Sequence, residues 1–373
     1  MFLAHKILIR PTREQEDYFR RACGTRRFAF NWGLARYKEH LDELKAGVRT
    51  DKPQVRKIRD ALVALKKTEL PWLSEVSSHI VGCAFEDLQS AFDKFFSKQN
   101  RFPKFASKHD GRDRFTINRK NETTFAIDSK ALRIPKLGWL KLAESLRFEG
   151  TIKFATISRQ ADRWFVSILV DVGDQRYHAP VVNPDMAIGV DLGINVLATL
   201  SNGETFENPR AYRRHENKLR KLQRKLSKKT RGGENYKRLK TKIAKVHARV
   251  VNIRTDVLHK LTTYLTSNFG HVVIEDLNVK GMLKGRIAKS LSDVSFYTIR
   301  TMLDYKSDLR GGQVYLVPRF FPSSQLCSVC GTKKKIARGE RVYSCDHCGH
   351  TMDRDLNAAI NICQHLTGVP SAA

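Results

Sequence analysis

The chain has 373 residues, too many for one ordinary hydrophobic core, so its length predicts two or three domains. Lysine and arginine number 68 against 38 acidic residues, and a net charge of +30 favours a nucleic-acid partner. No apolar run approaches the roughly 20 residues that span a bilayer, and the first residues carry no signal-peptide pattern. We therefore exclude an integral membrane protein and expect a cytoplasmic one.

The first hundred residues predict one strand followed by helices. Residues 2–9 alternate between apolar and polar types, as a half-buried strand does. Thr12 and Gln15 form a capping-box pattern that opens a helix. Helical periodicity continues to about residue 98, with breaks at residues 47–53 and at Pro71. One face of the last helix is expected to be core and consists of Phe85, Leu88, Phe92, Phe95 and Phe96.

From Arg101 the chain changes to short apolar runs separated by turn residues, which predict strands. These runs lie at residues 115–117, 124–127, 131–134, 139–142, 152–158 and 164–170. We interpret them as a small antiparallel barrel or sandwich that takes its edge strand from residues 2–9. The helices of residues 12–98 are then an insertion into it, and a linker is expected from Pro180 to Pro184.

The third region combines buried strands with helices, as an α/β domain does. Residues 186–193 form an apolar strand that ends in a carboxylate at a glycine turn, and a second strand, residues 196–200, returns at once. Another apolar strand, residues 271–276, closes on two acids. The remaining expected elements are a helix near 295–309, a strand at 313–317 and a final helix from about Leu356.

Half of the excess positive charge lies in residues 210–249, which hold 17 basic and 2 acidic side chains. Two apolar stripes, separated by Arg231-Gly232-Gly233, predict an antiparallel helical hairpin. Its seam is core packing, whereas its other faces carry like charges that repel unless phosphates or solvent ions neutralise them. A solvated face is the alternative to nucleic-acid contacts. The candidate contacts are Lys218, Lys221, Arg224, Lys225 and Lys228.

Two Cys-x-x-Cys pairs have the spacing of a zinc site with four thiolate ligands. The ligands are Cys327, Cys330, Cys345 and Cys348. Two disulfides would need an oxidising compartment, which the lack of a signal pattern disfavours. His347 and His350 lie close enough to replace one cysteine, although four thiolates need no substitute. We expect the remaining cysteines to be buried small side chains. They are Cys23, Cys83 and Cys363.

Asp191, Glu275 and Asp355 stand at the ends of two apolar strands and at the start of the final helix. A carboxylate at a strand end is costly to bury, so three of them in one domain indicate a metal site. Such oxygens can hold two magnesium ions, one to activate water and one to stabilise the leaving oxygen of a phosphodiester. Helix capping or solvation is the alternative for each residue alone. Asp276 and Asp353 compete for these positions, and we prefer Glu275 because it directly follows the apolar run.

Four segments of the chain carry a recognisable signature. They are Gly189-Val190-Asp191-Leu192-Gly193, Ile274-Glu275-Asp276-Leu277, Ser324-Gln325-x-Cys327-x-x-Cys330-Gly331 and Asp353-Arg354-Asp355-x-Asn357-Ala358-Ala359. Together they resemble the RuvC-like nuclease signature of the transposon-encoded TnpB family, which is similar to the compact ancestors of type V CRISPR effectors. The likeness extends to Phe102-Pro103-Lys104-Phe105 and Phe30-Asn31-Trp32, so it covers nearly the whole chain.

The resemblance implies a multidomain protein of α/β plus β class. An RNase H-like (RuvC) nuclease domain is expected at residues 184–319 and 353–373, with the basic hairpin at 207–268 and an inserted zinc ribbon at 320–352. A β-barrel wedge domain is expected at 1–11 and 99–180, carrying a helical recognition insertion at 12–98. By the same likeness, the acidic triad of the family falls on Asp191, Glu275 and Asp355, and its structural zinc on the four paired cysteines.

The resemblance also implies a function. The protein would be an RNA-guided, Mg²⁺-dependent endonuclease that cleaves DNA complementary to its guide RNA beside a short adjacent motif. Its partners would be a guide RNA from the transposon end and target DNA, double-stranded and single-stranded, with no membrane involved. We expect a monomeric ribonucleoprotein that works at the nucleoid.

Other functions compete with this one. An RNA-guided DNA-binding repressor on the same scaffold would not cleave, but such relatives are expected to have lost acids of the triad. A transposase of the three-carboxylate class orders its acids Asp, Asp, Glu, whereas the order here is Asp, Glu, Asp. A free-standing zinc-ribbon RNA binder would explain the charge and the cysteines and leave the three carboxylates without a role.

Overall fold

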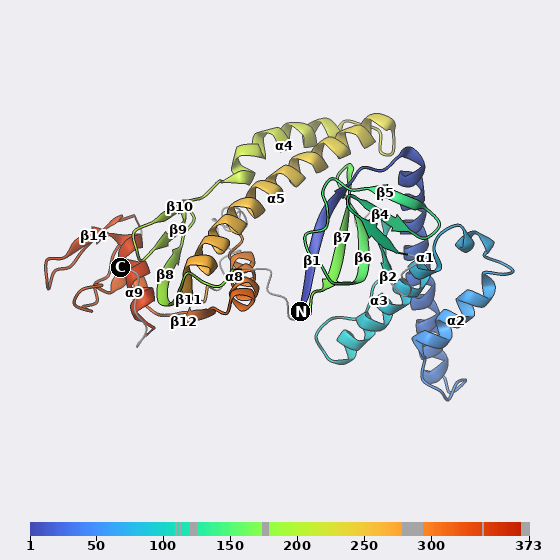
Figure 1. Ribbon diagram of the computed structural model, residues 1–373, viewed down its shortest axis with the longest axis horizontal. Helices are drawn as coiled ribbons and strands as arrows, with labels where there is room; N and C mark the ends of the chain where they lie inside the picture. The colour runs from blue at the N-terminus through green and yellow to red at the C-terminus, as the bar shows by residue number, and fades with distance from the viewer. Residues whose placement is uncertain are drawn as a thin grey trace. The chain divides into compact units, whose positions relative to one another are not determined.

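The computed structural model, drawn in Figure 1, divides into two compact units, Met1–Gln175 and Arg176–Ala373. The described residues are 1–108, 111, 113–118, 125–173, 179–277, 294–337 and 339–366. Each unit buries hydrophobic side chains of its own. Within the described ranges, no helix is long and apolar enough to cross a membrane.

The first unit contains a four-stranded antiparallel sheet in the order β1-β7-β6-β2. β1 (Phe2–Ile9) pairs along its whole length with β7 (Arg163–Asp171), and β6 (Thr151–Gln160) pairs with β7 and with β2 (Arg114–Asn118). Along β7 every second side chain is buried, because successive side chains of a strand point to opposite faces. The predicted pairing of the first strand with this sheet is confirmed.

A second, three-stranded sheet of this unit has the order β3-β4-β5. Its strands are β3 (Ala126–Asp128), β4 (Ala131–Ile134) and β5 (Gly138–Lys141). Among the described residues of this unit, an isolated bridge between Ile9 and Leu142 joins it to the first sheet. Thr124, predicted to start the first of these strands, lies outside the described residues. The expected barrel or sandwich is thus observed as two sheets joined at one bridge.

The helices of the first unit lie between β1 and β2, as predicted. α1 (Arg13–Lys45) begins at the expected capping box, in which Thr12 and Gln15 each accept a hydrogen bond from the backbone amide of the other. α2 (Val55–Leu65), the 3₁₀ helix η1 (Pro71–Ser74) and α3 (Ser78–Phe96) follow, separated at the predicted breaks.

Close packing of α1 on α3 explains which aromatic residues are buried. A Cβ atom on Gly33 would lie 2.7 Å from Cε1 of Phe85, so α1 approaches α3 where glycine leaves room. Phe85, Leu88 and Phe92 are buried as predicted. The prediction for Phe96 was wrong: its side chain is 62% exposed, because it is the last helical residue and its ring contacts are those with Phe92 and Phe95.

A mixed five-stranded sheet in the order β10-β9-β8-β11-β12 forms the centre of the second unit. β8 (Asn183–Leu192), β9 (Val196–Leu200) and β10 (Thr205–Glu207) are antiparallel neighbours, whereas β11 (Phe269–Glu275) runs parallel to β8 and to β12 (Gln313–Val317). The prediction of a linker from Pro180 to Pro184 extends too far, because β8 begins at Asn183, which pairs with Phe269 of β11. The short β10 was not predicted.

Helices cover both faces of this sheet. α5 (Glu234–Asn268) and α8 (Phe296–Arg310) bury Leu261 and Ile299 against one face, with Val272 of β11. α9 (Arg354–Gln364) buries Ile362 against the other face, with Val273. α4 (Ala211–Ser227) packs on α5 as the predicted antiparallel hairpin. The final helix begins two residues before the expected Leu356, because Asp353 caps it.

Candidate active site and metal centre

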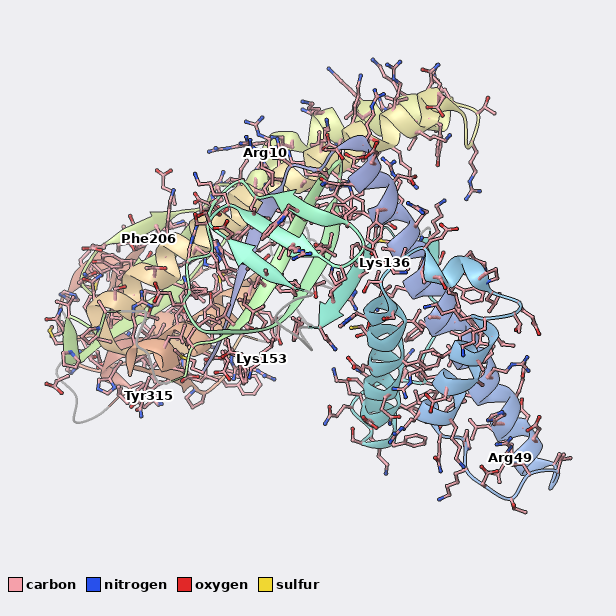
Figure 2. All side chains as sticks on the ribbon, turned by 45° about the vertical axis from the view of Figure 1, so that its right-hand side comes forward. Arg10, Arg49, Lys136, Lys153, Phe206 and Tyr315 are labelled. Carbon is pink, nitrogen blue, oxygen red and sulfur yellow. The ribbon has the colours of Figure 1, made fainter. Side chains whose placement is uncertain are left out.

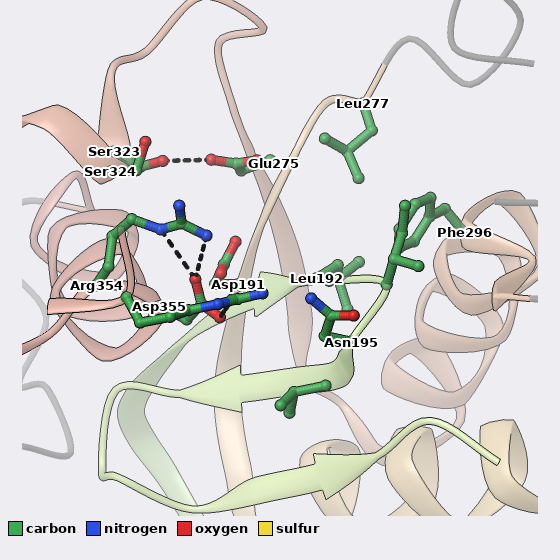
Figure 3. Close-up of a pocket in the computed structure, with 14 residues that line it drawn as sticks. Asp191, Leu192, Asn195, Glu275, Leu277, Phe296, Ser323, Ser324, Arg354 and Asp355 are labelled. Atoms are coloured by element: carbon green, nitrogen blue, oxygen red, sulfur yellow. Dashed lines mark hydrogen bonds and ion pairs between the residues drawn. The ribbon is translucent and has the colours of Figure 1, made fainter. Parts of the chain in front are cut away.

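Three acidic side chains from distant parts of the chain line one pocket of the second unit, shown in Figure 3. Asp191 lies at the end of β8, Glu275 is the last residue of β11, and Asp355 is in the first turn of α9. β8 and β11 are parallel neighbours, with Val190 paired to Ile274, so the carboxyl ends of both strands meet at one edge of the sheet. The structure therefore brings together all three acids predicted for the metal site.

Gly189 allows α9 to deliver the third acid. A Cβ atom at this position would lie 2.1 Å from the carbonyl oxygen of Ala359 and 2.6 Å from the amide nitrogen of Cys363. No larger residue fits there, so the glycine two positions before Asp191 lets the backbone of α9 rest directly on β8. This contact sets the position of Asp355 relative to the strand ends.

The electrostatics of the pocket fit a divalent cation. Burial, followed by the negative charges of Glu275 and Asp355, raises the pKa of Asp191 to about 7, although Arg354 opposes the shift. Burial also raises the pKa of Glu275, against a hydrogen bond from Ser323. A carboxylate whose ionised form is disfavoured by burial and by neighbouring acids, as that of Asp191 is, is the kind of ligand that a metal ion stabilises.

Glu275 and Asp355 each accept hydrogen bonds from side chains of the protein. Asp355 pairs with Nη2 of Arg354 at 2.9 Å and with Nη1 of Arg341 at 3.2 Å. The Ser323 hydroxyl donates to Glu275, and this bond and the pair with Arg354 are visible in Figure 3. Among the described residues, the four paired cysteines alone bring three or more ligand atoms within 4.8 Å of one another, so the three carboxylates of the pocket stand further apart than ligands that share one ion.

The two competing acids have other roles. Asp276 pairs with Nη2 of Arg319 at 2.7 Å and with Nη1 of Arg300 at 3.6 Å. Asp353 is the N-cap of α9, accepting hydrogen bonds from the amides of Asp355 and Leu356. Neither acid is among the residues that line the pocket of Figure 3. The pocket thus contains Glu275 and Asp355 and neither competitor, and the choice of these two acids as metal ligands stays a prediction.

The four predicted zinc ligands lie together in a small hairpin module that contains β13 (Val342–Ser344) and β14 (Thr351–Asp353). Their sulfur atoms all lie within 4.8 Å of one another. Each Cys-x-x-Cys turn is closed by a glycine of positive φ, Gly331 or Gly349, whose amide donates to the carbonyl of the first cysteine of the pair. The set fits one tetrahedral metal ion, and neither His347 nor His350 belongs to it.

Asparagines of α9 attach this module to the pocket. Asn357 donates to the carbonyl of Leu326 at 2.7 Å and accepts from the amide of Ser328 at 3.0 Å. Asn361 donates to the carbonyls of Leu326 and Ser323, each at 2.8 Å. Both asparagines are buried, so these bonds fix the segment that leads into the first cysteine turn against the helix that carries Asp355.

Sequence reasoning missed the residues that hold the acids. Ser323 lies next to the quoted Ser324-Gln325 segment, and Arg354 lies between two acids of another, so both had a signal that was not used. Arg341 had none, because it reaches the pocket from the module by the pairing of β13 with β14. The predictions of burial for Cys23, Cys83 and Cys363 are confirmed.

The basic hairpin presents its charge to solvent. Leu219, Val246 and Val250 are buried along the seam of α4 and α5, as predicted. The five candidate nucleic-acid contacts, Lys218, Lys221, Arg224, Lys225 and Lys228, are all exposed. The two acids of residues 210–249 pair with Arg220 and Lys237 in this hairpin. The charge is available to phosphates, and contact with them remains a prediction.

Comparison with known structures defines the class of fold. The solved structure described as the "Cryo-EM structure of the Cas12f1-sgRNA-target DNA complex" matches with a TM-score of 0.60 over 94% of this chain and 83% of that one, at 15% sequence identity. A family model described as "Cas12f1-like, TNB domain" matches residues 296–362, which include the cysteine module. One described as "Helix-turn-helix domain" matches residues 1–45, which here form one strand and one helix.

Relatives in sequence define the family. A model described as "Probable transposase", the OrfB protein of IS605 elements, matches residues 167–286. A Streptomyces pristinaespiralis protein named "Putative RNA-guided DNA endonuclease" is 38% identical over 96% of this chain and 88% of its own length. An Escherichia coli K12 protein named "Putative RNA-guided DNA endonuclease InsQ" is 34% identical over 96% and 91%. The chain belongs to the TnpB (OrfB) family of transposon-associated proteins.

Proposed function

We propose that this protein is a transposon-encoded RNA-guided DNA endonuclease that cleaves DNA complementary to its guide RNA beside a short adjacent motif. The observation that carries the proposal is the convergence of Asp191, Glu275 and Asp355 on one pocket. Its family includes relatives named for RNA-guided DNA cleavage. The catalytic residues of the proposal are these three acids, in an RNase H-like (RuvC) domain.

The three acids would hold Mg²⁺, because hard carboxylate oxygens are the ligands that this ion prefers. The bound metal would supply an activated water and stabilise the leaving oxygen of the phosphodiester. The chain itself orients the ligands: Ser323 holds Glu275, and Arg341 and Arg354 hold Asp355. Turning Asp355 from these arginines toward a cation would also free their guanidinium groups for the DNA phosphate.

The four paired cysteines would hold a structural Zn²⁺ as a closed tetrahedral site. Its proposed role is to fold the short module that carries Arg341 and follows Ser323. Asn357 and Asn361 bind the segment that leads into this module. Loss of the metal would therefore disturb the residues of the pocket, although the zinc itself would not contact DNA.

The proposed layout follows the sequence analysis. The nuclease domain comprises residues 184–319 and 353–373, the zinc ribbon 320–352, the wedge domain 1–11 and 99–180, and the recognition insertion 12–98. The strand order is β10-β9-β8-β11-β12. The first three of these strands pair antiparallel and the last two continue the sheet parallel to β8, an arrangement that supports the RNase H-like assignment. The partners would be a guide RNA from the transposon end and target DNA, in a monomeric ribonucleoprotein that acts where chromosomal DNA lies.

Sequencing of the RNA that copurifies with the protein tests the proposal first. One defined species at a one-to-one ratio, followed by Mg²⁺-dependent cleavage of matching DNA, would support it. Stable binding of matching DNA without cleavage would favour the repressor. Heterogeneous RNA fragments and no DNA recognition would favour a general RNA binder.

A further inference from the structure

The outer face of the three-stranded sheet presents a tryptophan among basic and small side chains. In the register of β3, β4 and β5, one row across the sheet consists of Ala126, Arg133 and Trp139. The adjacent row consists of Asp128, Ala131 and Lys141. Opposed residues of an antiparallel pair share a face, so these six side chains lie on one side of the sheet. The other side holds the buried Leu132 and Leu140.

Trp139 is unusually open for so large an apolar side chain. It is 49% exposed, and Arg133 and Lys141 beside it are exposed as well. Its neighbour diagonally across the strand pair is the small Ala131. The backbone beneath it is fixed, because Nε2 of Gln15 donates to the Trp139 carbonyl at 3.0 Å. The ring is thus held on a rigid sheet and open to solvent.

The charge around this ring is positive. Residues 126–142 contain four basic side chains and one acid, Asp128, which lies on β3 at the far edge. Arg10 continues the row of Lys141, since its amide donates to the Lys141 carbonyl at 2.9 Å. Figure 2 labels Arg10 and, in the turn between β4 and β5, Lys136. Within the described part of the chain, none of Arg10, Arg133 and Lys141 forms an ion pair.

We propose that this face binds an unpaired segment of RNA, with a base stacked on Trp139 and neighbouring phosphates bound by Arg133, Lys141 and Arg10. An exposed aromatic ring within a basic surface is how proteins hold unpaired bases, whereas paired bases leave no free face for an indole. A protein partner is less favoured, because the buried centre of a protein–protein interface is depleted of charged residues and of lysine in particular. The inference rests on the proposed function in that it gives the guide RNA a binding surface in the first unit.

The test uses the full-length protein, freed of nucleic acid at high salt, and an oligouridylate RNA with one 5-iodouridine. Irradiation is expected to crosslink the probe to Trp139. Trp139→Leu should weaken binding about 5- to 150-fold, because a stacked base is worth roughly 1–3 kcal/mol, whereas Trp139→Phe should stay within about 3-fold. Circular dichroism and thermal unfolding would verify that both variants fold.

The salt dependence separates stacking from charge. Arg133→Gln should lower the slope of log affinity against log salt by about 0.7, the value for one phosphate contact on a single strand, and Trp139→Leu should leave it unchanged. Lys67→Gln removes an exposed lysine after α2 and serves as the control, expected to leave both the salt slope and the crosslink unaltered. If Lys67→Gln and Arg133→Gln changed the salt slope equally, a local phosphate contact at Arg133 would be contradicted.

Two outcomes distinguish failure of this inference from failure of the proposed function. If wild-type protein cleaves guided DNA but neither crosslinks at Trp139 nor loses affinity in Trp139→Leu, the inference is overturned and the function stands. If Trp139 crosslinks and Trp139→Leu loses RNA, but the wild-type protein with its guide does not cleave matching DNA, the inference stands and the function fails. An oligothymidylate DNA probe with one 5-iodo-2′-deoxyuridine that crosslinks as efficiently as the RNA would overturn the assignment to RNA.

Discussion

The hydroxyl of Ser323 donates a hydrogen bond to the carboxylate of Glu275, at the edge of the sheet where the acids converge. The carbonyl of the same serine accepts from Asn361 of α9. One buried residue therefore links the strand that carries Glu275 to the helix that carries Asp355, just before the first cysteine turn. This link makes Ser323 a positioning residue for the pocket.

Ser323→Ala should raise the Mg²⁺ concentration needed for half-maximal cleavage. Groups that orient metal ligands are typically worth 10- to 100-fold in metal affinity or activity, and we expect about 10-fold here. A Mg²⁺ titration of cleavage by the ribonucleoprotein measures the effect, with Ser323→Thr as the control that keeps a hydroxyl. An unchanged titration curve in the alanine variant would mean that Glu275 needs no such support.

Asp191→Asn, Glu275→Gln and Asp355→Asn should each lower the cleavage rate by about a thousandfold or more while guide and target binding persist, because the carboxylates hold metal rather than nucleic acid. Single-turnover cleavage and binding assays measure the two separately. Asp276→Asn is the adjacent control, since Asp276 pairs with Arg319 outside the pocket, and it should keep measurable activity. Loss of activity in Asp276→Asn but not in Glu275→Gln would reverse the assignment at this strand end.

Fresh protein should contain one zinc ion per chain, measurable by elemental analysis. Cys327→Ser or Cys345→Ser should lower the zinc content, lower the unfolding temperature of the module and abolish cleavage, while most RNA affinity remains. Cys83→Ala, a buried cysteine of the first unit, should leave the zinc content unchanged. Wild-type protein without zinc would refute the metal assignment.

Changing Lys218, Lys221 and Lys225 together to Gln should weaken binding to all nucleic-acid sequences alike. Each phosphate contact that is lost with one of these lysines should lower the slope of log affinity against log salt by about 0.7 to 0.9. Affinity measurements over a series of salt concentrations provide the slope. If it does not change, the exposed face of α4 meets solvent alone.

The buried Lys306 predicts a pH effect on stability. Its ammonium group donates to Thr262, Thr263 and the His259 carbonyl, yet burial, followed by the charge of Arg310, lowers its pKa to about 8. Between about pH 8 and the unfolded value of 10.5, the unfolded chain therefore binds a proton that the folded chain has released. The free energy of unfolding should rise with pH across this window and be flat in this contribution below it.

Urea unfolding at pH 7.5 and pH 10 measures this change. Lys306→Met should remove the part of the rise that belongs to Lys306. Lys260→Met, which replaces an exposed lysine of α5, is the matched control and should retain it. An equal pH response in wild type and Lys306→Met would show that the pKa is not lowered in the folded protein.

Most of the pocket could be predicted because its parts are local signals: apolar strands that end in acids, and cysteines at fixed spacing. What failed depended on contacts between distant residues. The start of β8 at Asn183 is set by pairing with β11, and the place of Arg341 is set by a hairpin across the cysteine turns. Phe96 belongs to a helical apolar stripe, but only the packing of α3 against its neighbours decides that this last side chain of the stripe is exposed. The catalytic roles of the three acids remain predictions.

Reprogramming the guide is the decisive test of RNA-guided cleavage by this protein. The guide segment of the copurified RNA is replaced by an unrelated sequence, and cleavage of two plasmids, one matching each guide, is mapped in Mg²⁺ and in EDTA. We expect cleavage to move to the newly matched plasmid, to require Mg²⁺ and to disappear in Asp191→Asn. Cleavage that ignores the new guide, or that persists in EDTA or in Asp191→Asn, would contradict the proposed function.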